Sequence, residues 1–464
     1  MTLKISISGV RGFFPESLTL NISLDFAKAF GSYLGPNSTV VIGTDSRASS
    51  QEIKKTMFEG LKNSGTKVID LGIAPTPTVG IMTRELGASG GIIITASHNP
   101  LPWNGFKFVR SDGIFLNETQ AKELIRLYEE KKFVAEVETT SATRKPGCHN
   151  LVPTNKSQEI IINKSGITNH IKKVLKIVGA TKIKNKKFTV AIDACNGAGS
   201  VAAVKMAKAL GCEVIPINCD VTKPFPHDPE PIAKNLTELC ATIKKAKADI
   251  GFALDSDADR LAIVSNEGKP IGEELTLCLA AQFILSNSSK GQKIVTNLST
   301  TQVLDDIAKE FGAEVIRTKI GEVHVAEKIK ELKALVGGEG NGGVIVPAIG
   351  FNRDSLAGMA MILNLMADSG KTISDLAAEL PSYQVIKEKI ECFDLQQVKE
   401  KIARVKLAFA NDKLDLTEGV KVIFPDGWVH VRASNTEPVI RIIAETRTLK
   451  RTEELIRQAL QAVN

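Results

Sequence analysis

Three aspartates stand at every second position of one short segment, as Asp255, Asp257 and Asp259 in DSDADR. Like charges this close together are costly unless a cation neutralises them, and carboxylate oxygens are the ligands that Mg²⁺ and Ca²⁺ prefer. An EF-hand loop starting at Asp255 would need Gly at its sixth position, where the chain has Arg260. We therefore predict a metal site. A solvated acidic turn and a phosphatase that uses Asp255 as its nucleophile are the alternatives.

A second polar loop, TASHNP at 95–100, ends a run of β-branched residues. Ser97 stands beside His98, and no GxSxG elbow surrounds it, so a hydrolase nucleophile is not indicated. A phosphorylated serine near a divalent cation would supply oxygens that complete the metal shell. His98 suits a base or an ordinary hydrogen-bonding residue. Lys107, a few residues downstream, could reach the same loop or lie on the surface.

Two further loops carry groups that suit a phosphorylated sugar. GEGNGG at 338–343 places a carboxylate and an amide among glycines, which suits vicinal hydroxyls as well as a simple tight turn. RASNTEP at 432–438 combines an arginine with hydroxyls, as phosphate sites do; a capped turn is the alternative. The residues concerned are Glu339 and Asn341 in the first loop, and Arg432, Ser434, Asn435 and Thr436 in the second.

The elements that must position these loops form a pattern that occurs three times: strand, helix, strand, helix, strand. The first unit begins with strands at 40–45 and 67–72 around a helix at 49–65, where Ser49 and Glu52 have the spacing of a capping box. Its closing strand leads into TASHNP, and the closing strands of the next two units lead into DSDADR and GEGNGG. Ligands bind beyond the carboxyl ends of parallel strands, so we expect one shared cleft.

The predicted fold class is α/β, with three related domains whose sheets lie between helices and a smaller C-terminal α+β domain, all around a central cleft. The strand-rich segment after residue 381 has the pattern of an antiparallel sheet followed by a helix. The expected domains are residues 1–150, 151–262, 263–381 and 382–464.

Composition excludes several other classes of protein. The net charge of +7 suits anionic small ligands, and few aromatic residues interleave with the basic run at 164–187, so we expect no nucleic-acid partner. Seven cysteines without a CxxC motif indicate reduced thiols. The N-terminus has no signal-peptide core, and the apolar stretch around 275–285 is too short to span a bilayer. We expect a cytoplasmic protein with no membrane partner.

With its four loops taken together, the chain resembles the α-D-phosphohexomutase family over essentially its whole length. TASHNP is similar to the family's phosphoserine loop, DSDADR to its magnesium loop, GEGNGG to its sugar-recognition loop and RASNTEP to its phosphate-binding loop. SGVRG at 8–12 resembles the N-terminal arginine motif, and NGFK at 104–107 resembles the motif with the proposed acid/base lysine.

The resemblance implies a reaction cycle. A phosphoryl group passes from Ser97 to a bound hexose phosphate, and the bisphosphorylated intermediate returns its other phosphate, so that sugar 1-phosphate and 6-phosphate interconvert. One Mg²⁺ per chain and an activating sugar bisphosphate are implied, in a monomer or homodimer. The implied residues are Ser97, Asp255, Asp257 and Asp259 for the metal, Arg11, His98 and Lys107 for transfer, and Arg260, Glu339, Asn341, Arg432, Ser434, Asn435 and Thr436 for the substrate.

Two loops depart from common patterns of the family. Asn341 and Gly343 stand where many members have Ser and His, and RASNTEP replaces RPSGTEP. The GEGNGG form resembles a branch often assigned to phosphoglucosamine mutase, so glucosamine phosphate is slightly favoured over mannose or glucose phosphate. A sugar-phosphate sensor without turnover is the alternative outside enzymes.

Overall fold

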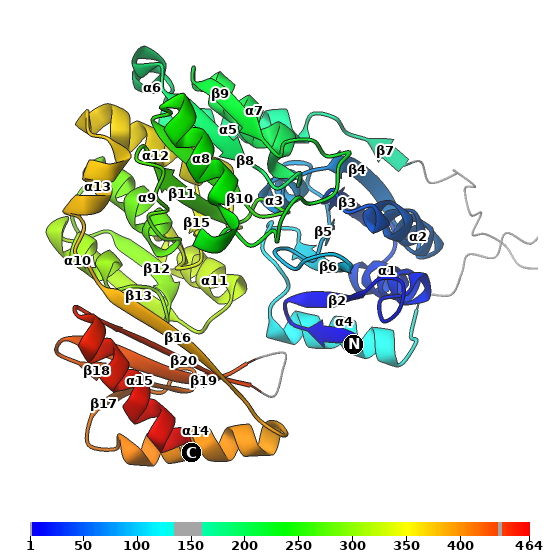
Figure 1. The fold of residues 1–464 in the computed structure, drawn as a ribbon. Coiled ribbons are helices and arrows are strands. Elements are labelled where there is room, and N and C mark those ends of the chain that lie inside the picture. Colours follow the sequence, from blue (N-terminus) through cyan, green and yellow to red (C-terminus); the bar gives the residue numbers. More distant parts are fainter. Residues whose placement is uncertain (1, 134–159, 435–438) are drawn as a thin grey trace, which may run out of the picture.

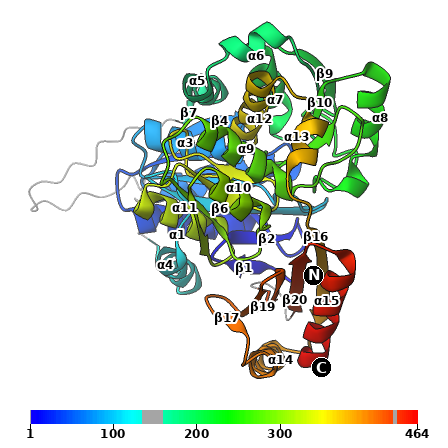
Figure 2. The ribbon, with the colours of Figure 1, turned by 90° about the vertical axis from the view of Figure 1, so that its left-hand side faces the viewer.

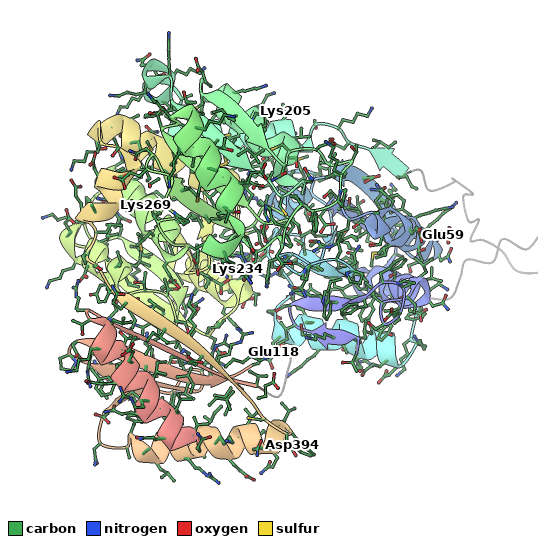
Figure 3. All side chains as sticks on the ribbon, in the orientation of Figure 1. Glu59, Glu118, Lys205, Lys234, Lys269 and Asp394 are labelled. Carbon is green, nitrogen blue, oxygen red and sulfur yellow. The ribbon has the colours of Figure 1, made fainter. Side chains whose placement is uncertain are left out.

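The computed structural model describes residues 2–133, 160–434 and 439–464, and these residues form four β-sheets. The sheets follow one another around an arc in chain order, and the C-terminal sheet projects from the other three in both views (Figures 1 and 2). Charged side chains such as those of Glu59, Lys205 and Lys269 extend from the periphery (Figure 3). Among the described residues, no helix is both long enough and apolar enough to cross a membrane.

The first sheet has seven strands, with helices on both faces. Its strand order is β1-β2-β6-β5-β3-β4-β7, in which β5, β3, β4 and β7 are parallel. Alternate residues of β3 pack on opposite sides: Val40 and Ile42 join the core with α1 and α2, whereas Val41 packs against α3. The elements are β1 (Lys4–Ser6), β2 (Gly9–Phe13), α1 (Leu20–Leu34), β3 (Thr39–Thr44), α2 (Ser49–Asn63), β4 (Lys67–Ile73), α3 (Thr76–Glu85), β5 (Gly90–Ile94), β6 (Trp103–Arg110), α4 (Glu118–Glu129) and β7 (Ile160–Ile162).

The second sheet has four strands in the order β11-β10-β8-β9, with β11 antiparallel to β10. The closing strand β10 is buried at every residue and lies between β11 and β8. The elements are α5 (Gly166–Val178), α6 (Thr181–Lys186), β8 (Thr189–Asp193), α7 (Gly199–Ala209), β9 (Glu213–Ile217), the 3₁₀-helix η1 (Ala233–Asn235), α8 (Thr237–Ala246), β10 (Ile250–Leu254) and β11 (Leu261–Ser265).

The third sheet has the order β13-β12-β14-β15. Read from its other edge, as β15-β14-β12-β13, it matches the second sheet strand for strand. Helix α12 is buried along most of its length and packs on α5, α6 and α7 as well as on α9, so the second and third units share one core. The elements are α9 (Glu274–Ser286), β12 (Lys293–Asn297), α10 (Val303–Glu310), β13 (Glu314–Thr318), α11 (Glu322–Leu332), β14 (Val336–Glu339), β15 (Gly343–Ile345), α12 (Ser355–Ser369) and α13 (Ile373–Glu379).

The fourth sheet is antiparallel, with the order β16-β20-β19-β18-β17, and it has a core of its own with α14 and α15. This confirms the smaller C-terminal α+β part. The elements are β16 (Gln384–Glu391), α14 (Leu395–Ala408), β17 (Lys413–Asp415), β18 (Val420–Phe424), β19 (Gly427–Ala433), β20 (Val439–Thr446) and α15 (Leu449–Val463).

The predicted threefold pattern is confirmed, with one addition. Each closing strand, β5, β10 or β14, lies between the first parallel strand of its unit and an antiparallel strand that follows it. The functional loops therefore leave the interior of each sheet rather than an edge. A polar loop that follows a buried interior strand is anchored on both sides, which suits the precise placement of side chains.

Some local details differ from the expectations. Helix α2 begins at Ser49 itself and its N-cap Ala48 makes no side-chain bond, so the predicted capping box is wrong. The Ser49 hydroxyl accepts a hydrogen bond from Asn104 Nδ2 at 2.8 Å instead. Strand β7 joins the first sheet from beyond residue 150, and β11 crosses the expected boundary at residue 262.

Candidate active site

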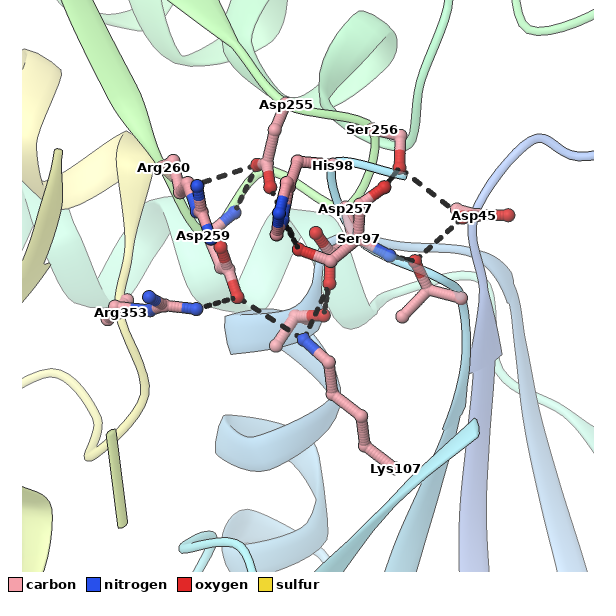
Figure 4. A network of polar contacts seen from close by, with 12 residues as sticks. Asp45, Ser97, His98, Lys107, Asp255, Ser256, Asp257, Asp259, Arg260 and Arg353 are labelled. Carbon is pink, nitrogen blue, oxygen red and sulfur yellow. Dashed lines mark hydrogen bonds and ion pairs between the residues drawn. The ribbon is translucent and has the colours of Figure 1, made fainter. Parts of the chain in front are cut away.

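Ser97 and the aspartate loop meet where the first and second units face each other (Figure 4). Ser97 Oγ donates a hydrogen bond to Asp255 Oδ2 at 3.2 Å, and the serine is 1% exposed. Its backbone has φ = +52°, in the left-handed region that non-glycine residues rarely adopt. Such a conformation persists only where the surroundings enforce it.

A network of polar contacts holds Ser97 in that conformation. Its backbone N–H donates to Thr95 Oγ1 at 2.8 Å, and the Thr95 hydroxyl donates to Asp45 Oδ2 at 2.7 Å. Its carbonyl oxygen accepts from Arg47 Nη2 at 2.9 Å and from Ser256 Oγ at 2.6 Å. Arg47 also forms a buried ion pair with Asp45. Because Ser256 belongs to the aspartate loop, the two loops are fixed to each other and not only to their own sheets.

The three aspartates are fully buried, and oxygens of all three lie within 4.8 Å of one another. Asp255 Oδ1 accepts the backbone N–H groups of Asp259 and Arg260, at 3.0 and 3.1 Å. The Oδ1 atoms of Asp257 and Asp259 are buried and have no hydrogen-bond partner. Two buried carboxylate oxygens without partners, beside a third carboxylate, form the hard donor set that Mg²⁺ requires. The residues present therefore fit a magnesium ion.

The pKa values of Asp255 and Asp259 are shifted in opposite directions. Burial and the charges of Asp259 and Asp257 raise the pKa of Asp255 well above its usual range. Burial also acts to raise the pKa of Asp259, but the cationic groups of Arg353 and Lys107 lower it overall. A bound cation would relieve the repulsion that raises the pKa of Asp255.

Lys107 and Arg353 approach the aspartate loop from different sides (Figure 4). Lys107 Nζ lies 3.0 Å from Asp257 Oδ2 and 3.3 Å from Asp259 Oδ2, and Arg353 Nη2 lies 2.7 Å from Asp259 Oδ2. Burial lowers the pKa of Lys107, yet the two aspartates raise it overall, which favours the ammonium form. These cations contact only the Oδ2 atoms of Asp257 and Asp259, so the Oδ1 atoms of both residues stay available to a metal ion.

His98 and Arg11 lie at the same place. His98 Nδ1 is 3.4 Å from Ser97 Oγ. Burial lowers the pKa of His98 well below its usual value, and the nearby guanidinium of Arg260 lowers it further, so the imidazole is neutral. Burial likewise lowers the pKa of Arg11. A neutral imidazole beside a serine hydroxyl can accept and return a proton.

A cavity of about 460 Å³ opens beside these groups, and residues of all four parts of the chain line it. Its wall includes Arg11, His98 and Lys107 from the first unit, Arg260 from the second, Glu339, Asn341 and Arg353 from the third, and Lys387, Arg432 and Arg441 from the C-terminal part. In total the wall carries seven arginine or lysine side chains and five glutamates, and this net positive lining suits a ligand with more than one anionic group.

The loop at 338–343 presents Glu339 and Asn341 to this cavity. Glu339 Oε1 accepts from Asn297 Nδ2 at 3.0 Å, and Oε2 accepts from Arg353 Nη1 at 2.8 Å. Asn341 Oδ1 is buried without a hydrogen-bond partner. Its carbonyl oxygen is therefore available to a donor on a ligand, such as a hydroxyl.

The C-terminal loop reaches the cavity through Arg432. Its Nη1 lies 3.6 Å from Glu418 Oε1, and burial lowers its pKa. Ser434 is buried, donates its backbone N–H to Val439 O at 2.7 Å and is not part of the cavity lining. Asn435 and Thr436 lie outside the described residues.

Several residues of the site were not predicted from the sequence. Arg353 contacts the aspartate loop and the 338–343 loop together. Thr76 donates from Oγ1 to Asp257 Oδ2 at 2.7 Å, and Arg47 supports Ser97. A usable signal existed for Arg47, because DSR at 45–47 is a short polar segment that directly follows the buried strand β3. Arg353 stands just before the N-cap of α12 and several residues after the end of β15, so it gives no such signal, and neither does Thr76.

Comparison with known families covers nearly the whole chain. Residues 3–135, 168–268 and 272–383 match the alpha/beta/alpha domains I, II and III of phosphoglucomutase/phosphomannomutase, and residues 389–462 match the C-terminal domain of the same proteins. The order of the four matches is the order of the four sheets.

Individual proteins agree with this result. The chain is 34% identical to a probable phosphoglucosamine mutase of Methanopyrus kandleri, over 97% of this chain and 95% of that protein. It is 36% identical to a phosphoglucomutase/phosphomannomutase of Thermococcus kodakarensis, with the same two coverages. A crystal structure of a phosphoglucomutase/phosphomannomutase family protein of Burkholderia thailandensis is 26% identical and superimposes with a TM-score of 0.84, covering 99% of this chain and 97% of that one.

Proposed function

Because this chain belongs to the phosphoglucomutase/phosphomannomutase family of isomerases, we propose that it interconverts the 6-phosphate and 1-phosphate of a hexose through a phosphorylated Ser97. The placement of Ser97 is the observation that carries the proposal. Its hydroxyl lies 3.2 Å from Asp255 within a buried acidic cluster, next to a cavity with a cationic lining. This arrangement supports the proposal, because a phosphorylated serine, a metal ion and an anionic sugar phosphate could all be held there.

In the first half-reaction, the P–Oγ bond of phosphorylated Ser97 breaks and a P–O bond forms on the free hydroxyl of a bound hexose monophosphate. The proton of that hydroxyl passes through His98, whose Nδ1 is 3.4 Å from Ser97 Oγ, and ends on Oγ. The bisphosphorylated sugar turns over in the cavity. The second half-reaction breaks its other P–O bond and returns that phosphoryl group to Ser97, while the proton moves back to the sugar oxygen.

This chemistry depends on positioning and charge neutralisation more than on covalent catalysis. Asp255, Asp257 and Asp259, with a phosphoryl oxygen on Ser97, would hold Mg²⁺, which neutralises charge on the transferred group. Lys107 supplies a fixed positive charge next to the aspartates. Arg11 supplies another from the cavity wall.

The remaining residues are proposed to bind the substrate. Glu339 and Asn341 are assigned to sugar hydroxyls, since both line the cavity and Asn341 Oδ1 has no partner. Arg260 lines the cavity together with His98, whose pKa is lowered by burial and by this guanidinium. The distal phosphate, which is not reacting, is assigned to the C-terminal loop through Arg432, Ser434, Asn435 and Thr436.

Glucosamine phosphate is the proposed sugar. A relative with 34% identity carries the name probable phosphoglucosamine mutase, and the GEGNGG loop resembles that branch. Mannose or glucose phosphate is the second candidate, because the relative of Thermococcus kodakarensis is named phosphoglucomutase/phosphomannomutase. Initial rates with the 6-phosphates of glucosamine, glucose and mannose, measured side by side, decide between them: kcat/KM should be highest for the glucosamine compound.

Ser97→Ala tests the central assignment. Activity should fall to background, and a phosphoryl group that intact-mass analysis is expected to find on the wild-type protein should be missing. Ser369→Ala, at the end of α12, is the matched control and should keep both. Phosphate on Asp255 in place of Ser97 would indicate the phosphatase alternative. Binding of sugar phosphates without turnover in the wild type would indicate a sensor.

Three accompanying properties are also proposed. A sugar bisphosphate should activate the enzyme, because it phosphorylates Ser97 of any unphosphorylated chain. A cytoplasmic location is consistent with the six cysteines of the described residues, which form no disulfide. The chain is proposed to be a monomer or homodimer, which sedimentation of the purified protein can establish.

A further inference from the structure

One buried histidine outside the cavity joins all three α/β units. His170 lies on α5 and is fully buried. Its Nδ1 is 2.9 Å from Thr78 Oγ1 on α3, and its Nε2 is 2.8 Å from Asp354 Oδ2 at the N-cap of α12. The carboxylate can only accept, so Nε2 donates to Asp354, while Nδ1 and the threonine hydroxyl share the other hydrogen bond.

The first of these contacts leads directly to the aspartate loop. Thr78 belongs to the first turn of α3, which begins with Thr76. The Thr76 backbone N–H donates to the carbonyl oxygen of Asp257 at 2.9 Å, and its hydroxyl donates to Asp257 Oδ2 at 2.7 Å. Any rotation of this turn would therefore move the Asp257 carboxylate.

The second contact leads to the other end of the same loop. Asp354 Oδ1 caps α12 by accepting from the backbone N–H groups of Leu356 and Ala357. Its neighbour Arg353 donates to Asp259 Oδ2 at 2.7 Å. Its other neighbour, Ser355, donates from the backbone to Ala258 O at 3.3 Å and from Oγ to Arg260 O at 2.8 Å.

We propose that His170 is a positioning residue for the aspartate loop at 255–260. The imidazole joins the N-terminal ends of α3 and α12, which both form hydrogen bonds with this loop. It thereby sets the separation of the Asp257 and Asp259 carboxylates. The inference rests on the proposed function in one respect only, that the loop holds the metal of the mutase.

The surroundings argue against a purely structural role. Ile171 and Val174 on the same helix are buried in the apolar core, together with Ile81 of α3 and Leu356 of α12. An apolar side chain at position 170 would extend this core without the desolvation cost of a polar group. Buried polar groups contribute little net stability but restrict geometry strongly, which is the property that a metal site needs.

The test compares His170→Ala with Val174→Ala, a substitution one turn further along α5 at a fully buried apolar residue whose side chain has no hydrogen bond to offer the loop. Binding of Mn²⁺ alone is followed by electron paramagnetic resonance on protein freed of metal, and kcat and KM are measured with Mg²⁺ and hexose phosphate. We expect His170→Ala to weaken Mn²⁺ binding by about three- to tenfold, below the loss seen for partners in direct contact with a metal ligand, and to lower kcat more than it raises KM. Val174→Ala should lower Tm and leave the Mn²⁺ Kd within about twofold.

Conservative variants separate the two contacts. His170→Gln can keep the donor to Asp354 and His170→Asn can keep a hydrogen bond to Thr78, so each should recover part of the lost Mn²⁺ affinity. If His170→Ala does not fold, Thr78→Val removes one contact with little change in shape and should still weaken Mn²⁺ binding.

An unchanged Mn²⁺ Kd and kcat in His170→Ala, with a Tm loss like that of Val174→Ala, would overturn the proposal. A wild-type protein that binds Mn²⁺ but converts no hexose phosphate would instead contradict the proposed function, and the Mn²⁺ measurements would still decide the role of His170.

Discussion

Arg353 donates from Nη2 to Asp259 Oδ2 over 2.7 Å, so that a side chain of the third unit holds a carboxylate of the second. The same guanidinium donates from Nη1 to Glu339 Oε2 over 2.8 Å. One planar cation therefore sets the distance between the aspartate loop and the 338–343 loop. A lysine has the same charge but cannot form this fork.

Arg353→Lys is thus expected to lower kcat/KM by about one to two orders of magnitude, since a charge-assisted hydrogen bond contributes about 1.5–3 kcal/mol. Arg353→Ala should in addition lower Tm clearly, because it removes a buried cation that pairs with both Asp259 and Glu339, a change that costs about 3–5 kcal/mol. Steady-state kinetics and calorimetry measure both effects. Arg451→Lys, at a more exposed ion pair with Asp426, is the control. Wild-type kinetics in Arg353→Lys would contradict the bridging role.

Asp257→Asn tests the metal site. The substitution removes one of three negative charges and keeps a similar shape, so the Mg²⁺ concentration that gives half-maximal activity should rise at least about tenfold. Saturating Mg²⁺ should stabilise the wild type by about 2–3 kcal/mol and the variant by much less, as thermal unfolding with and without a chelator will show. Asp368→Asn, in an ion pair with Lys182, should behave as wild type. No effect of Mg²⁺ on wild-type Tm or activity would make the loop a simple acidic turn.

The raised pKa of the Glu274 carboxyl should make the stability of the protein depend on pH. Burial raises its pKa to about 7, with Lys387 opposing the shift. Between pH 4.5, its usual pKa, and pH 7, the folded protein keeps a proton that the unfolded chain has released. Stability should therefore fall as the pH rises through this window. The full contribution, about 3 kcal/mol, is lost above pH 7.

Glu274→Gln removes this titration. Its free energy of unfolding relative to wild type should increase between pH 5 and pH 8 by up to about 3 kcal/mol. Urea unfolding at several pH values measures the difference. The exposed Glu331→Gln should show no such trend. A pH-independent difference between Glu274→Gln and wild type would contradict the raised pKa.

Arg432→Ala tests whether the C-terminal part binds the distal phosphate. Arg432→Ala should lower kcat/KM by about one to two orders of magnitude, because a charge-assisted hydrogen bond to the distal phosphate is lost. The bisphosphorylated sugar should also escape more often, so the variant should need markedly more added sugar bisphosphate for full activity. Arg404→Ala, on α14 and away from the cavity, is the control. Unchanged kinetics and an unchanged bisphosphate requirement would remove the 432–438 loop from the active site.

The sequence alone was sufficient for the features that depend on local patterns. Buried apolar strands followed by polar loops predicted where Ser97 and Asp255 stand, because a strand that is buried on both faces has a continuous apolar sequence. The alternation of strands with amphipathic helices predicted three α/β units, and four motifs in order predicted the family. Each of these signals lies within a few residues of the feature that it predicts.

The contacts that complete the site were decided by tertiary structure. Arg353 lies 94 positions from Asp259 and Thr76 lies 181 from Asp257 along the chain, so no local pattern could pair them. The Ser49 capping box failed for the same reason, since its hydroxyl bonds to Asn104, 55 positions away. A short pattern records which backbone conformation a segment prefers. Which distant polar group satisfies a buried carboxylate depends on how the sheets and helices pack, because burial is what makes an unpaired group costly.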